Sequence, residues 1–124
     1  MEDNFTETKD ESGLTRKDYY GEPGNQPWDR IKRRGHAPEF AAGNIDKYLN
    51  RPGKGKPDDA EKACWYWKEL FRMACMLVTD EEREMPLFVQ SCYRAQGIWQ
   101  VMVDELSPEA KARLPKLSHQ IIED

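Results

Sequence analysis

The sequence is poor in the features that mark membrane, secreted and metal-binding proteins. No run approaches the roughly 18 apolar residues of a membrane span, and the acidic first eleven residues lack the apolar stretch of a signal peptide. Three cysteines and two histidines occur in 124 residues, and no Cys/His spacing resembles a zinc site. We therefore expect a protein of the cytoplasm with reduced thiols, no membrane association and no metal site.

Alternating hydrophobicity and internal repeats are also missing, which argues against a sheet or a solenoid. Apolar residues recur instead at intervals of three and four, as in amphipathic helices. We predict an all-α fold with a helical hairpin (about residues 38–51 and 58–78), a long third helix (86–106) and a C-terminal helix. A short helix near Trp28 precedes them. Residues 1–17 are expected to be a disordered or loosely held tail, and residues 18–124 a single domain.

Local signals predict where several helices begin. Thr79 and Glu82 have the spacing of a capping box. Pro86 either kinks the chain or restarts a helix, and Ser107-Pro108 is typical of a helix start.

The net charge of −4 conceals a basic centre. Residues 30–56 carry eight basic and two acidic side chains, whereas the segments on either side are each acidic by five charges. Such a cationic segment suits a phosphate-bearing ligand, although charged surface is also common without any ligand. The acidic total and the absence of a recognition-helix pattern argue against nucleic acid.

Polar side chains on the predicted hairpin are the best candidates for a binding site. Asn44, Lys47 and Arg51 share one helix face, and Lys62 and Tyr66 share a face of the next helix. Between them, Gly53-Lys54-Gly55-Lys56 precedes a helix start, where backbone N–H groups favour anions. Each pattern also fits a solvated helix face or a flexible connector. The predicted ligand-binding residues are Asn44, Lys47, Tyr48, Arg51, Lys54, Lys56, Lys62 and Tyr66.

Catalytic signatures are absent from the sequence. The Gly-Lys loop lacks the spacing of a P-loop and follows no strand. His36 and His119 have no partners that indicate catalysis. Asp58, Asp59 and Glu61 either hold a divalent ion or, more commonly for acids at a helix start, favour the helix dipole.

Nearly half of the chain resembles a family of small bacteriophage proteins, most of unknown function, that are labelled nucleotide kinases. The resemblance lies in Asp18-Tyr19-Tyr20, Pro27-Trp28-Asp29, residues 40–51, Gly53-Lys54-Gly55-Lys56 and residues 59–66. The chain departs from the family pattern where Tyr19-Tyr20 replaces a histidine-tyrosine pair and where Gly55 separates two lysines. Residues after about 72 have no counterpart. The resemblance implies a phage origin, a helical hairpin and nucleotide binding.

Two functions of different classes follow. The first is binding of a nucleotide or related phosphorylated ligand, with phosphorylation of nucleoside monophosphates by a nucleoside triphosphate as the activity that the resemblance implies. The second is a non-catalytic interaction with a host protein during infection. The tryptophan content also predicts a homo-oligomer, with Trp99, Met102 or Val103 of the third helix at its interface.

Overall fold

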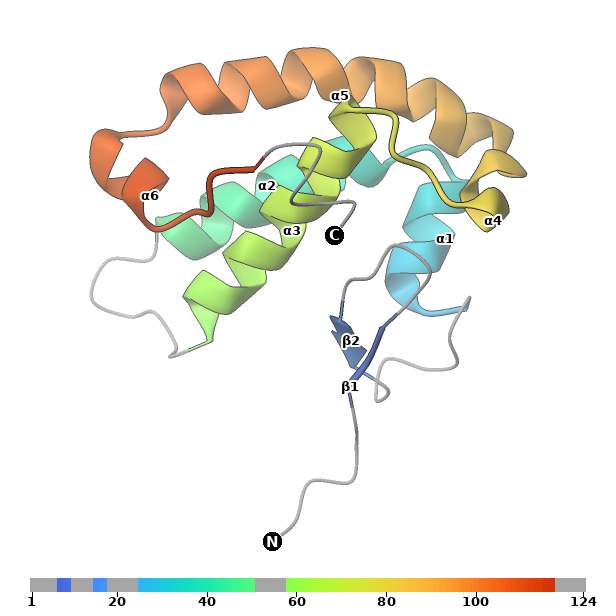
Figure 1. Ribbon diagram of the computed structural model, residues 1–124, viewed down its shortest axis with the longest axis horizontal. Helices are drawn as coiled ribbons and strands as arrows, with labels where there is room; N and C mark the ends of the chain where they lie inside the picture. Colours follow the sequence, from blue (N-terminus) through green and yellow to red (C-terminus); the bar gives the residue numbers. More distant parts are fainter. Residues whose placement is uncertain (1–6, 10–14, 18–24, 51–57, 118–124) are drawn as a thin grey trace, which may run out of the picture.

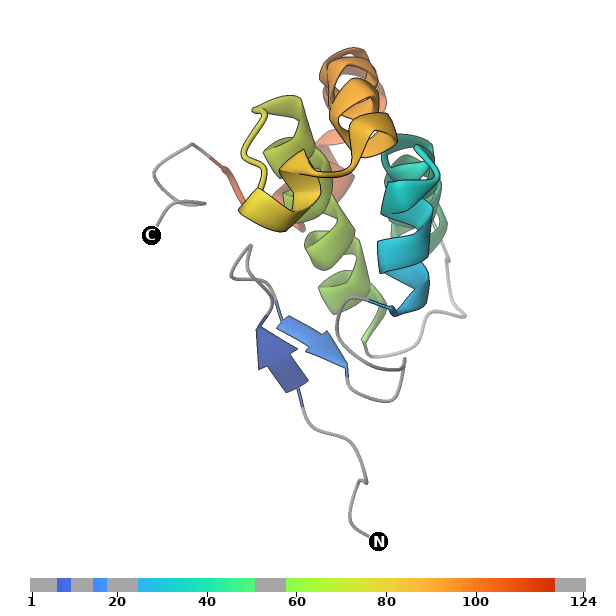
Figure 2. The same ribbon diagram turned by 90° about the vertical axis from the view of Figure 1, so that its right-hand side faces the viewer.

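The computed structural model describes residues 7–9, 15–17, 25–50 and 58–117. The body of the protein consists of three long helices, α2 (Ala37–Leu49), α3 (Asp59–Ala74) and α5 (Pro86–Glu105). α2 and α3 run antiparallel as a helical hairpin, and α5 lies across both of them (Figure 1). Viewed from the side, α5 sits above the line where α2 meets α3 (Figure 2). The predicted all-α fold, with its hairpin and long third helix, is confirmed.

Three short helices complete the bundle, and their starts follow the sequence signals. They are α1 (Pro27–Arg33), α4 (Asp80–Arg83) and α6 (Pro108–Ala112). At α4 the Glu82 amide donates to the Thr79 hydroxyl and the Thr79 amide donates to the Glu82 carboxylate, which makes the predicted capping box. The Ser107 hydroxyl accepts from the Ala110 amide at the start of α6. Pro86 begins α5, so this proline restarts a helix.

The end of α3 differs from the prediction, since the helix stops at Ala74 and not near Val78. Met76 adopts a left-handed conformation with φ 57°. The Leu77 amide donates to the Arg72 carbonyl at 2.9 Å and the Met76 amide donates to the Met73 carbonyl at 3.0 Å. This is a Schellman ending, in which glycine usually occupies the left-handed position. Because methionine stands there instead, the sequence carried no stop signal.

Two strands, which the sequence did not predict, lie within the expected N-terminal tail. β1 (Glu7–Lys9) and β2 (Thr15–Lys17) pair antiparallel, with Thr8 opposite Arg16. Three residues each are too few for a recognisable alternation.

The core lies where the three long helices meet, and it consists largely of the predicted apolar stripes. Its fully buried side chains include Ala41, Ile45, Ala63, Leu70, Met73, Phe88, Cys92 and Ala95. Ala60, an apolar residue in the first turn of α3, is exposed. Among the described helices, none combines the length and apolarity that crossing a bilayer requires.

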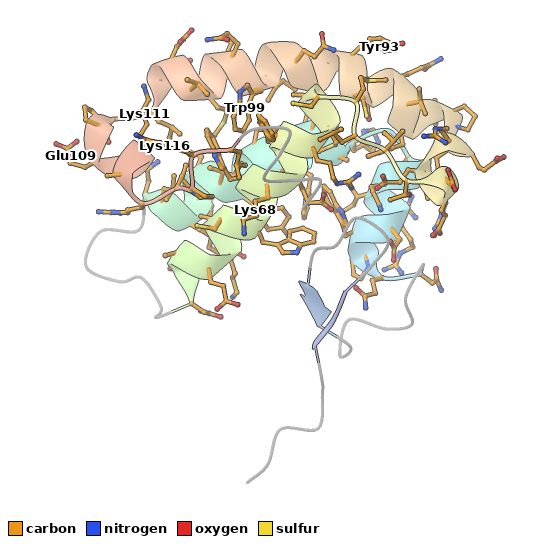
Figure 3. All side chains as sticks on the ribbon, in the orientation of Figure 1. Lys68, Tyr93, Trp99, Glu109, Lys111 and Lys116 are labelled. Atoms are coloured by element: carbon orange, nitrogen blue, oxygen red, sulfur yellow. The ribbon has the colours of Figure 1, made fainter. Side chains whose placement is uncertain are left out.

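Trp99 is partly buried against this core. Its ring centroid lies 4.1 Å from that of Trp67 and 5.0 Å from that of Phe71, both on α3 (Figure 3). Met102 and Val103 are partly buried against the same core. Trp99, Met102 and Val103 are thus partly buried within the chain, and their place at an oligomer interface stays a prediction.

A close approach between Gly35 and α5 fixes the turn from α1 to α2. Gly35 has φ +78°, and a Cβ there would lie 3.2 Å from the Leu87 Cβ. Arg94 of α5 donates to the Gly35 carbonyl at 2.6 Å and to both carboxylate oxygens of Glu39 on α2. The hydrogen bond from Arg94 lowers the pKa of Glu39. Only glycine combines this backbone conformation with so short a contact.

Candidate ligand-binding site

The hairpin brings four of the predicted site residues together. Five of the eight are described, and Arg51, Lys54 and Lys56 lie outside the described residues. The Nζ of Lys47 is 5.1 Å from the centroid of the Tyr48 ring, and the Nζ of Lys62, from the other helix, is 5.4 Å from it. Tyr48 stacks on Tyr66 with a centroid distance of 6.5 Å and an interplanar angle of 13°. The structure therefore brings Lys47, Tyr48, Lys62 and Tyr66 together, and their role in ligand binding stays a prediction.

The α2 side of this surface is open over one turn. Phe40, Gly43, Asn44 and Lys47 follow the spacing of one helix face, and Phe40 is 40% exposed. No atom of the residues that the structure describes lies within 4 Å of the position that a Cβ on Gly43 would take. Asn44 donates through one amide hydrogen to the Phe40 carbonyl at 2.9 Å. Its second amide hydrogen and its carbonyl oxygen are the groups that a ligand edge would use.

The charges at the site are two cations and one nearby carboxylate. Lys47 is exposed, while Lys62 is partly buried and forms an ion pair with Asp58 at 3.3 Å. Because the two ammonium groups lie 5.1 and 5.4 Å from the centroid of one ring, they are no more than about 10.5 Å apart, a distance comparable to the Debye length at physiological ionic strength. Two cations therefore stand against one paired carboxylate at this ring, which leaves one positive charge in excess.

Tyr66 joins the site to a larger set of rings, which we call the aromatic cluster: Trp28, Phe40, Tyr48, Trp65 and Tyr66. The Tyr66 centroid lies 5.9 Å from those of Trp28 and Phe40 and 5.0 Å from that of Trp65, in edge-to-face contacts. Such contacts stabilise ring orientation by about 0.5–1.5 kcal/mol per pair beyond burial. The stacked tyrosines are thus held by rings from α1, α2 and α3.

Beside the aromatic cluster lies a set of buried charges that the sequence did not predict. We call Asp29, Lys32, Glu69, Arg72 and Glu82 the buried charge network; each is at most 5% exposed. Arg72 donates two hydrogen bonds to the Glu82 carboxylate, at 2.6 and 2.7 Å, and one to Glu69 at 2.9 Å. Lys32 donates to Glu82 at 2.9 Å, and the Trp28 indole donates to Glu69 at 2.9 Å. The network therefore connects α1, α3 and α4.

Hydrogen bonds and neighbouring charges favour the ionised forms of Glu82 and Arg72 in spite of their burial. Burial by itself would raise the pKa of Glu82, but the hydrogen bonds and charge of Arg72, with Lys32 and the Thr79 amide, lower it to about 2. Burial would likewise lower the pKa of Arg72, but Glu69 and Glu82 raise it further above its ordinary value. Trp28 belongs to the aromatic cluster and hydrogen-bonds to this network, so the network helps to hold the aromatic cluster in position.

The sequence contains a signal for the buried charge network, namely charged residues at positions inside an apolar stripe. Glu69 and Arg72 interrupt the apolar stripe of α3 at positions whose neighbours Leu70, Phe71 and Met73 are buried. Charged residues at such positions are almost never fully buried unless they are paired. Lys32 was counted in the cationic segment, but it is buried and paired, and the surface charge of that segment is correspondingly smaller.

Other candidate chemistry receives less support. Over residues 25–50 and 58–117, where side chains are described, no group of three His, Cys, Asp or Glu residues is arranged to hold a metal ion. His36 is exposed at the start of α2, and His119 lies outside the described residues. The three cysteines are free thiols.

Comparison of the chain with protein-family models, with curated proteins and with solved structures finds no match. The resemblance to small phage proteins accordingly stays a prediction from the residues quoted above.

Proposed function

We propose that the surface formed by Asn44, Lys47, Tyr48, Lys62 and Tyr66 binds a nucleotide or a related phosphorylated small molecule. The observation that carries the proposal is the meeting of Lys47 and Lys62, from two different helices, at the ring of Tyr48. Two cations held at one aromatic ring combine the two properties that a nucleotide site needs, charge for phosphate and π surface for a base.

The proposal gives each side chain a role. Lys47 and Lys62 neutralise the phosphate, with Lys62 exchanging part of its interaction with Asp58 for the ligand. The tyrosine pair offers ring surface to the base, and base–aromatic stacking contributes about 1–3 kcal/mol per base. Asn44 lies one turn before Tyr48 on α2, where its amide reaches hydrogen-bonding groups of the ligand. Gly43 leaves the backbone of α2 accessible beside it.

Phosphoryl transfer from a nucleoside triphosphate to a nucleoside monophosphate is the activity that the family resemblance adds to this proposal. That reaction depends mainly on positioning and charge neutralisation. Lys47 and Lys62 supply charge, but a catalytic residue is not assigned. Formation of nucleoside diphosphate from the two substrates, followed by chromatography, tests transfer separately from binding.

Isothermal titration calorimetry with nucleoside mono- and triphosphates tests the binding site. We expect Lys47→Ala and Lys62→Ala each to weaken binding by about 1.5–3 kcal/mol, the loss of a hydrogen bond to a charged group. Lys68→Ala is the matched control, because Lys68 lies on α3 two residues after Tyr66 and about 200° around the helix from it (Figure 3). Its affinity should equal that of the unaltered protein.

Two outcomes would refute the proposal. One is the absence of heat at millimolar concentrations of every nucleotide in the panel. The other is an equal loss of affinity in Lys68→Ala and Lys62→Ala, which would show that the overall charge matters and the site does not. Circular dichroism of each variant separates a lost contact from a lost fold.

A further inference from the structure

The outer face of α5 has the composition of an interface and not of an ordinary helix surface. From Pro86 to Val103 the helix carries a single charged residue, Arg94, although 34% of the whole chain is charged. Depletion of charge, together with exposed aromatic residues, distinguishes protein interfaces from the remaining surface. Tyr93 is 63% exposed and points away from the hairpin (Figure 3).

A regular stripe runs along this face. Exposed residues follow alternating spacings of three and four, the pattern by which one helix packs along another: Leu87, Gln90, Arg94, Gly97, Val101 and Asp104. Leu87 is 49% exposed and Val101 52% exposed. Both ribbon views show α5 as the outermost long helix, with α2 and α3 packed against the side of α5 that is opposite this stripe (Figures 1 and 2).

Packing within the described part of the chain does not explain Gly97. Among the described residues, no atom lies within 4 Å of the position that its Cβ would take, so their packing does not require a glycine. Glycine in an exposed helix interior costs about 1 kcal/mol relative to alanine. A side chain from another helix that packs onto the exposed backbone at Gly97 would explain why a glycine stands there.

We propose that α5 forms a homodimer with α5 of a second copy, in antiparallel orientation. An antiparallel pair centred near residue 99 sets Val101 of each chain on Gly97 of the other. The same register sets Arg94 of each chain opposite Asp104 of the other, so that both contacts occur twice across the two-fold axis. A parallel pair would instead oppose Arg94 to Arg94 and Asp104 to Asp104, and like charges in contact are unfavourable.

The existing contacts of the two charged residues are compatible with this pairing. Arg94 is about half exposed, and its bonds to Glu39 and Gly35 use Nε and Nη2, which leaves the hydrogens of Nη1. Asp104 accepts from Gln100 through Oδ1, which leaves Oδ2. The charge pair thus forms without breaking the contact that joins α5 to α2.

The dimer is expected to be of moderate affinity. In this register residues 93–105 of the two helices lie opposite each other, a length of about 20 Å, and such a pair buries less than the roughly 1,600 Å² of a standard interface. Sedimentation equilibrium over about 1–100 μM protein should therefore show a transition from 14.5 kDa to twice that mass.

Substitutions on the stripe locate the interface. Val101→Arg should weaken dimerisation about tenfold or more, because it places a bulky cation against Gly97. Gln96→Arg adds the same charge to an exposed position off the stripe and should leave the dissociation constant unchanged. Asp104→Arg should also weaken the dimer, and its effect should shrink at high salt.

Each alternative result overturns the proposal. A monomer mass at every concentration tested would show that α5 does not pair with a second copy, and the α5 face would then be a contact for a different protein. A dimer that Val101→Arg and Gln96→Arg affect equally uses another surface, and a mass above that of a dimer is incompatible with a closed two-fold pair. No nucleotide is present in these measurements, so their outcome is independent of the ligand-binding proposal.

Discussion

Replacing Arg72 with methionine tests how strongly the buried charge network stabilises the fold. The network contains three carboxylates and two cations, so the substitution leaves three buried carboxylates against Lys32 alone. A pKa of about 2 for Glu82, against an ordinary value of 4.5, corresponds to about 3 kcal/mol of stabilisation of its charged form. Removing one partner of a buried pair typically costs about 3–5 kcal/mol. We expect the free energy of unfolding to fall by that amount near neutral pH.

The pKa of Glu82 also predicts in which direction the stability deficit of Arg72→Met changes with pH. In the unaltered protein the lowered pKa of Glu82 contributes stability that is complete above about pH 4.5 and is lost as the pH falls toward about 2. Without Arg72, Glu82 loses two of the causes that lower its pKa while burial, which raises it, remains, so we expect the pKa of Glu82 to rise in this variant. Protonation then relieves the buried charge, so the stability deficit of Arg72→Met should shrink as the pH is lowered from about 7 to about 5.

Urea unfolding followed by far-ultraviolet circular dichroism measures both effects. Arg83→Met is the matched control, because the Arg83 side chain is 65% exposed and its partner Asp80 is 95% exposed. That variant should change stability by no more than about 0.5 kcal/mol. If Arg72→Met does not fold, Arg72→Lys keeps the charge, loses the two-point contact with Glu82 and should show a smaller deficit. Equal stability of the Arg72→Met and Arg83→Met variants, or a deficit independent of pH, would refute the reasoning.

Three further substitutions or labels test other parts of the structure. Gly35→Ala should lower the free energy of unfolding by about 1–3 kcal/mol, because φ is +78° and the new Cβ meets Leu87; thermal unfolding no different from that of the unaltered protein would contradict this. Gly43→Ala should raise stability by about 1 kcal/mol and weaken nucleotide binding in calorimetry, and a gain in stability without loss of affinity would remove Gly43 from the site. Burial raises the pKa of Cys92 to about 11, so a thiol reagent should modify partly buried Cys64 and Cys75 first, and rapid labelling of Cys92 would show that the core opens readily.

Features that depend on neighbouring residues were predictable. The capping box of Thr79 and Glu82 and the Ser107 cap involve partners three residues apart. The apolar stripes gave the helices and most of the core, because a helix repeats its inward face every three or four residues. The end of α3 was not predictable in this way, since Met76 takes a conformation that glycine usually adopts.

Features that depend on distant residues were not predictable. Lys32 and Glu82 are 50 positions apart, and Trp28 and Glu69 are 41 apart. A lysine or glutamate in a sequence is normally an exposed residue, and only packing of several helices creates a dry interior in which the charges must pair. Packing also decided which rings Trp99 contacts, since its own helix does not indicate that Trp67 and Phe71 of α3 lie beside it.

The candidate site combines both kinds of information. The sequence by itself determined that Asn44, Lys47 and Tyr48 lie on adjoining turns of one helix and that Lys62 and Tyr66 lie one turn apart on the next. Only the tertiary structure decided that Lys47 and Lys62 meet at the same tyrosine ring. Helix periodicity fixes which side chains share a face, whereas the relative rotation and crossing of two helices are set by how the buried side chains of α2, α3 and α5 fit together.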